Sequence, residues 1–149
     1  MIRRRSAPAA EATQVIREIL RRSGHEIRNA LNAVAVNVEV VRSRAGREGT
    51  GEVTSFAERA GSQIAEASAL TDGLLALLGL VVRAQAESGV KVSTDHAHGS
   101  RIELTSYTEA GGSVSDIGRL ASRIDVGVEE HAGTVILSVY PEGTSHSKI

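Results

Sequence analysis

Residues 27–41 read IRNALNAVAVNVEVV, and this stretch decides most of the fold. Its large apolar residues recur at positions 27, 31, 34, 38 and 41, in steps of 4, 3, 4 and 3. That heptad-like spacing places one apolar stripe along an α-helix. Apolar residues at 16, 19 and 20 continue the pattern upstream, so we predict one helix over residues 11–44. A rod of roughly 51 Å with a single apolar stripe needs a partner helix to be stable.

The partner helix follows in the sequence. Apolar residues again repeat at steps of 3 and 4 from Val53 to Val81, after a glycine-rich stretch at 44–51. We therefore predict an antiparallel helical hairpin over residues 11–87, preceded by a flexible arm at 1–10. One hairpin leaves half of its apolar surface exposed. Two hairpins related by a two-fold axis would bury it in a four-helix bundle, which predicts a homodimer.

Residues 88–149 have a different pattern and are predicted to form a small C-terminal α/β domain. Strands are expected at Val90–Thr94, Arg101–Thr108 and Thr134–Tyr140, where β-branched residues gather. Between the last two, the sequence predicts a helix that starts near Ser113 or Ser115, covers 116–131 and ends at Gly133. The domain would have the order β-β-α-β, and the whole chain would be of the α+β class.

Composition excludes several classes of function. The 17 basic and 18 acidic residues give a net charge of −1, which offers no electrostatic case for nucleic acid. The absence of cysteine excludes disulfides and thiolate catalysis. The longest strictly apolar run, Leu74–Leu78, is far below the roughly 18 residues that span a bilayer. With no apolar signal segment at the N-terminus, we expect a cytoplasmic protein without a membrane partner.

The candidate chemistry lies in the first helix, at His25. Ile27 belongs to the apolar stripe, and a step of two residues turns a helix by about 200°, so His25 is predicted to point away from the stripe. Glu26 is adjacent, and Asn29 lies one turn later on the same face as His25. An exposed imidazole beside a carboxylate can accept a phosphoryl group on a ring nitrogen. On spacing alone, an exposed histidine on a helix is more often an ordinary surface residue.

The string from His25 to Asn32, HEIRNALN, resembles the H-box of two-component sensor histidine kinases. It matches that family's His-Glu-(Ile/Leu)-Arg-(Asn/Thr)-Pro-Leu pattern at six of seven positions, with Ala30 in place of proline. In that family the motif lies on the first helix of a dimerisation and phosphotransfer hairpin. The resemblance implies that His25 is the phosphoacceptor, that Glu26 assists transfer, and that Asn29 positions water for dephosphorylation. The loss of proline implies a straighter helix.

The resemblance to a histidine kinase fails beyond residue 87. The helix predicted at 116–131 has no asparagine for magnesium, and no Asp-x-Gly-x-Gly segment for adenine occurs. Residues 88–149 thus resemble a truncated Bergerat fold that cannot bind ATP. The chain as a whole resembles the dimeric histidine phosphotransferases, which relay phosphate to or from receiver-domain aspartates. That resemblance implies a response-regulator receiver or a histidine kinase as partner, no cofactor of its own, and Mg²⁺ supplied by the receiver.

An alternative function is a non-catalytic dimeric scaffold, or pseudokinase, that binds response regulators or a histidine kinase. Two lesser features also have two interpretations. The run at 95–98, Asp-His-Ala-His, could offer metal ligands, although such a run is more often a polar turn. Arg21, Arg22 and Arg28 surround His25 in sequence; they either dock an acidic partner or phosphoryl group, or form the outer face of the bundle.

Overall fold

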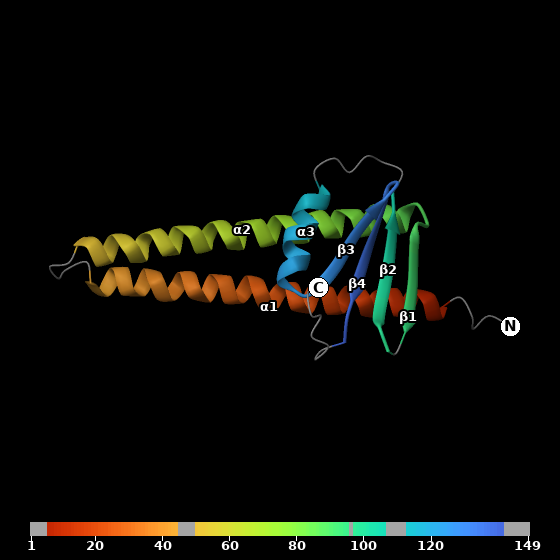
Figure 1. The fold of residues 1–149 in the computed structure, drawn as a ribbon, viewed down its shortest axis with the longest axis horizontal. Helices are drawn as coiled ribbons and strands as arrows, with labels where there is room; N and C mark the ends of the chain where they lie inside the picture. The colour runs from red at the N-terminus through yellow and green to blue at the C-terminus, as the bar shows by residue number, and fades with distance from the viewer. Residues whose placement is uncertain (1–5, 45–49, 96, 107–112, 142–149) are drawn as a thin grey trace, which may run out of the picture.

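The computed structural model describes residues 6–44, 50–95, 97–106 and 113–141. Two long helices, α1 and α2, lie side by side as a hairpin, and a four-stranded sheet with a short helix, α3, packs on one end of it (Figure 1). The chain is of the α+β class, as predicted. The elements in chain order are α1 (Ser6–Arg44), α2 (Thr50–Ala86), β1 (Val90–Asp95), β2 (Gly99–Thr105), α3 (Ser113–Arg123), β3 (Val126–His131) and β4 (Thr134–Val139).

The helical hairpin is confirmed, with one change at its start. Helix α1 begins at Ser6, earlier than the predicted residue 11, so part of the predicted 1–10 arm is helical; residues 1–5 lie outside the described residues. A proline at position 8 is compatible with this, because the first backbone N–H groups of a helix have no intrahelical partner. Between the helices, the Asn37 side-chain amide donates to Gln63 Oε1 at 2.7 Å, which fixes the hairpin register.

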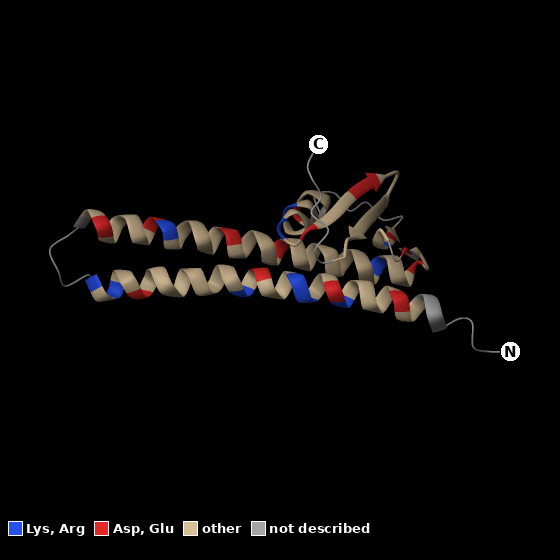
Figure 2. Cartoon of the chain, turned by 60° about the horizontal axis from the view of Figure 1, so that its bottom comes forward, with Lys and Arg blue, Asp and Glu red and all other residues tan. Residues whose placement is uncertain are grey.

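Each long helix has one stretch without charged residues, and the two stretches lie at different levels of the hairpin. No charged residue stands between Arg28 and Glu39 on α1, or between Asp72 and Arg83 on α2 (Figure 2). Over Gly51–Ala86, an 18-residue window has a mean hydropathy of 1.6, and 28% of that window is buried. By length and composition alone, this helix could cross a membrane. The same composition is required of a helix that packs on several neighbours in a bundle.

The prediction of a helix over 116–131 is wrong in its second half. Helix α3 ends at Arg123, and Val126–His131 instead forms β3, which pairs with β4 through a turn at Ala132 and Gly133. Asp125 takes a left-handed conformation (φ 56°), which stops the helix without a glycine. Ala132 (φ 47°) and Gly133 (φ 80°) then form the tight two-residue turn. The order of the C-terminal unit is therefore β-β-α-β-β.

The sheet is antiparallel throughout, in the order β1-β2-β4-β3. Its inner face packs on the hairpin and α3, and all three contribute to one hydrophobic core. The buried members include Val15 and Ile19 of α1, Leu70, Leu77 and Leu80 of α2, Ile102 and Leu104 of β2, Ile117 and Leu120 of α3, and Val135, Leu137 and Val139 of β4. The sheet and α3 therefore share their core with the hairpin.

Helix α3 crosses α2 at Gly73, where the two backbones come unusually close. A Cβ atom added at Gly73 would lie 2.5 Å from the carbonyl oxygen of Asp116 and 2.8 Å from Cβ of Leu120. Neither atom can move without moving α3, because one belongs to its backbone and the other is bonded directly to it. Glycine at this position is thus what permits the helix crossing.

The predicted apolar stripe of α1 continues beyond the covered end of the hairpin. There Leu31 and Val38, one heptad apart, are about half exposed. On α2, the exposed residues Ile64, Leu75 and Val82 are likewise separated by whole numbers of turns and share one face. The stripe is therefore partly uncovered in the single chain.

Candidate functional site

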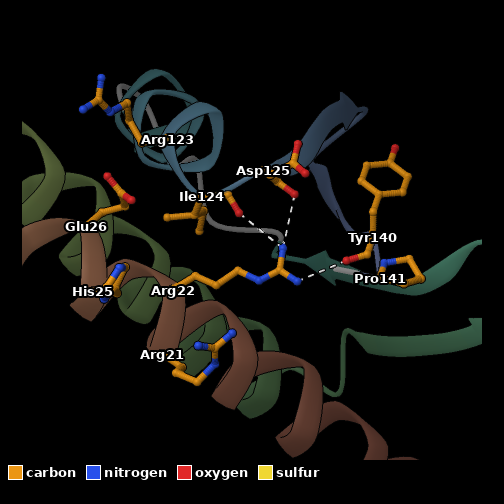
Figure 3. Close-up of a pocket in the computed structure, with 9 residues that line it drawn as sticks. All are labelled: Arg21, Arg22, His25, Glu26, Arg123, Ile124, Asp125, Tyr140 and Pro141. Carbon is orange, nitrogen blue, oxygen red and sulfur yellow. Dashed lines mark hydrogen bonds between the residues drawn. The ribbon is translucent and has the colours of Figure 1, made fainter. Parts of the chain in front are cut away.

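A pocket of about 460 Å³ opens between α1 and the C-terminal unit, at the position of the candidate histidine. Three segments that are far apart in sequence form its walls (Figure 3). The lining residues are Arg21, Arg22, His25 and Glu26 on α1, Arg123, Ile124 and Asp125 between α3 and β3, and Tyr140 and Pro141 after β4. The pocket is thus a feature of the assembled fold.

His25 lies on the exposed face of α1, as its helical position relative to Ile27 predicts. Its imidazole forms no hydrogen bond or ion pair with any residue that the structure describes. Glu26 is partly buried in the same pocket, and Figure 3 shows it reaching toward the end of α3 with His25 beside it. The imidazole of His25 is therefore exposed and unpaired at the edge of the pocket.

Asn29, the third predicted site residue, is exposed one turn beyond His25 on α1 and does not line the pocket. The fold thus brings His25 and Glu26 together and leaves Asn29 on the adjacent open surface. A ligand bound at His25 that extends along α1, away from the sheet, would meet Asn29 next.

Arg22 has a role that neither sequence interpretation foresaw. Its side chain is only 13% exposed, and its guanidinium reaches from α1 to the C-terminal unit. Nη1 donates to the backbone carbonyls of Ile124 at 3.3 Å and Asp125 at 3.5 Å, and Nη2 donates to that of Tyr140 at 3.1 Å (Figure 3). Arg22 therefore joins the hairpin to the two segments that form the opposite wall of the pocket.

Glu18 connects Arg22 to its neighbour Arg21. Its Oε1 accepts from Arg22 Nε at 2.7 Å and from Arg21 Nη2 at 2.8 Å, while its Oε2 accepts from Arg21 Nε at 2.9 Å. The hydrogen bonds from Arg21, then those from Arg22, lower the pKa of Glu18 from 4.5 to about 2 against the opposing effect of burial. Nε of Arg22 thus donates to Glu18, while its two Nη atoms donate to carbonyls of the C-terminal unit.

The other arginines near His25 differ in their surroundings. Arg123 forms an ion pair with Glu66 of α2 at 2.6 Å, across the α3 crossing. Arg21 is 57% exposed and lies four residues before His25, on nearly the same helix face. Arg28 is exposed and outside the pocket lining. Arg21 and Arg123 thus both line the pocket and are about half exposed, and each is paired with a glutamate.

The run at 95–98 forms a polar turn between β1 and β2. Asp95 accepts from the backbone N–H of Ala97 at 2.9 Å and lies 2.6 Å from Nδ1 of His98; His96 lies outside the described residues. Within the described parts of the chain, no three carboxylate or histidine groups come together as metal ligands. The described residues of this run therefore agree with its interpretation as a polar turn.

In comparisons with known proteins, the chain matched no family model, no curated protein and no solved structure.

Proposed function

We propose that the chain is a histidine phosphotransfer protein of a two-component phosphorelay, with His25 as the phosphoacceptor. One observation carries the proposal. The histidine of an H-box-like string is exposed, lies beside Glu26, and opens into a pocket that also presents Arg21. A surface histidine without a function would not need an adjacent carboxylate or a pocket that contains an arginine.

The reaction is a phosphoryl exchange between an aspartate and an imidazole. A ring nitrogen of His25 attacks the phosphorus of a receiver aspartyl phosphate; the P–N bond forms, the P–O bond breaks, and the aspartate carboxylate leaves. The carboxylate of Glu26 would stabilise the positive charge that develops on the ring. Arg21 offers a guanidinium to the phosphoryl oxygens. The receiver supplies the Mg²⁺.

The partners follow from the same proposal. A second copy of the chain would cover the exposed apolar residues of the hairpin, such as Leu31 and Val38, and complete a four-helix bundle. A response-regulator receiver, or a histidine kinase, would enter at the pocket. Residues 88–149 would be a reduced Bergerat domain that no longer binds ATP, and the protein would act in the cytoplasm. Asn29, on the open side of His25, would act on the water that removes phosphate.

The test is phosphotransfer from a labelled receiver. Receivers from the same cell, phosphorylated with a labelled small donor, should pass an acid-labile, alkali-stable phosphate to the chain. His25→Gln should abolish labelling while leaving the circular dichroism spectrum and the molar mass unchanged. Glu26→Gln should slow transfer, and Asn29→Ala should mainly slow the loss of phosphate to water.

The exposed His131 provides the matched control. His131→Gln should label like the wild type, and labelling retained in His25→Gln would contradict the proposal. Binding of a receiver without any phosphotransfer would instead support the scaffold alternative.

A further inference from the structure

The junction between the hairpin and the C-terminal unit contains a second functional feature. Arg22 is largely buried and donates to three backbone carbonyls that stand more than 100 residues away in sequence. Every residue has a backbone carbonyl oxygen that can accept a hydrogen bond, whatever its side chain is. The contact therefore joins the Arg22 side chain to the backbone of the C-terminal unit. The planar guanidinium is suited to this, because its fork of N–H donors has a fixed geometry.

The three carbonyls belong to the wall that faces His25. Ile124 and Asp125 form the turn between α3 and β3, Tyr140 follows β4, and all three line the pocket. Arg22 itself stands one turn before His25 on the same helix. One helical turn and one guanidinium therefore link His25 directly to the opposite wall, in addition to the hydrophobic core that the two units share.

Glu18 determines where that guanidinium points. Its carboxylate holds Nε of Arg22 at 2.7 Å and is itself held by Arg21 from the other side. A side chain with several rotatable bonds is thereby kept in one orientation, so little entropy is lost when it binds the carbonyls.

From this geometry, and resting on the proposed function, we infer that Arg22 is a positioning residue for phosphotransfer. It keeps the C-terminal unit fixed opposite His25, so that a receiver meets both walls of the pocket at one spacing. The C-terminal unit is then a fixed docking wall rather than a mobile domain. Misplacement of a reacting group by about 1 Å can cost on the order of 100-fold in rate.

The experiment compares two phosphate donors on Arg22→Gln and Arg22→Lys. With the labelled receiver that transfers fastest to the wild type, we expect Arg22→Gln to lower the apparent second-order rate at least about tenfold. Arg22→Lys, which keeps the charge but not the fork, should fall in between. With phosphoramidate, a donor too small to need the wall, both variants should label His25 at the wild-type rate.

Arg17→Gln is the matched control, because Arg17 is exposed on α1 and lies outside the pocket lining. It should match the wild type with both donors. Wild-type transfer from the receiver to Arg22→Gln would overturn the inference. Equal slowing with both donors would also overturn it, since Arg22 would then act on His25 or on folding.

A third measurement needs no receiver. The chain has no cysteine, so spin labels can be placed at Val36→Cys on α1 and Ser122→Cys on α3, both exposed. Diluted with unlabelled chain, the pair should give a narrow distance distribution that broadens in Arg22→Gln. An unchanged distribution would overturn the inference. If no receiver labels the wild type, the proposed function fails, and this measurement still decides whether Arg22 fixes the wall.

Discussion

The two halves of the hairpin are built from similar helices but are completed in different ways. Near the start of α1 and the end of α2, one apolar face of the hairpin is covered by the sheet and α3 of the same chain (Figure 1), while Leu75 and Val82 on another face of α2 stay exposed. Toward the hairpin loop, neither the described strands nor α3 cover the two helices, and residues such as Leu31 and Val38 stay half exposed. The covered half is completed within one chain, whereas the open half presents apolar side chains that the proposed second copy would cover.

The largest effect should come from a charge in the open half. Leu31→Glu would place a carboxylate in the proposed two-fold interface at two symmetry-related positions, and an unpaired buried charge costs several kcal/mol at each. Light scattering should show the wild type at about twice the 15.6 kDa chain mass and the variant at the single mass. Val36→Glu is the control, because exposed Val36 lies about 140° around the helix from Leu31. A monomeric wild type would contradict the dimer.

Two leucines on α2 compare the face of the helix that the chain covers with the face that it leaves exposed. Leu77 is 3% exposed in the single chain and Leu75 is 62% exposed, although they are two residues apart. Leu77→Ala should lower the free energy of unfolding by about 2–5 kcal/mol, because it leaves a cavity in the shared core. Leu75→Ala should act through dimerisation, so its effect on urea unfolding should depend on protein concentration. Equal, concentration-independent losses would contradict the comparison.

Two glycines on α2 allow the crossing with α3, at Gly73, to be compared with an uncovered part of the same helix, at Gly61. Gly73→Ala should destabilise by about 1–3 kcal/mol, because the new methyl group would overlap the backbone of α3. Gly61→Ala should stabilise by up to about 1 kcal/mol, because nothing lies within 4 Å of its added Cβ and alanine favours a helix. Thermal unfolding of the pair measures both. A stabilised Gly73→Ala would mean that α3 can move away from α2.

The smallest effect is the pH dependence from Glu18, in the covered half. Its pKa is lowered to about 2 in the folded chain, against 4.5 ordinarily, so the folded state binds fewer protons. Its contribution to stability is complete above about pH 4.5 and is lost as the pH falls toward 2. Glu18→Gln should flatten this part of the stability curve. The loss should be modest, because water screens the exposed Arg21.

The sequence predicted the hairpin well because a long helical period is a strong signal. It also placed His25 on the exposed face, since that follows from its spacing from Ile27. It failed at 126–131, where Ile124 and Val128 extend the helical period of α3 while Val126 and Val128 also alternate as in a strand. The left-handed Asp125 decided between the two, and aspartate is a weaker stop signal than glycine.

The role of Arg22 could not be predicted for a different reason. Its partners are main-chain carbonyls of Ile124, Asp125 and Tyr140, and every residue carries such a group. The residue types at those three positions therefore do not predict an arginine partner. Only the fold, which brings the end of α3 and the end of β4 to α1, reveals the contact.

The central place of β4 has a consequence for how the chain is made. It lies between β2 and β3, yet of the described strands it is the last to be synthesised. The hairpin can form early, because its contacts are local along the chain. Until β4 leaves the ribosome, however, β2 lacks its inner neighbour and the apolar faces of both units stay open to other chains. Ribosome stalling before β4 has emerged should therefore yield a protein that aggregates, with its helices already formed.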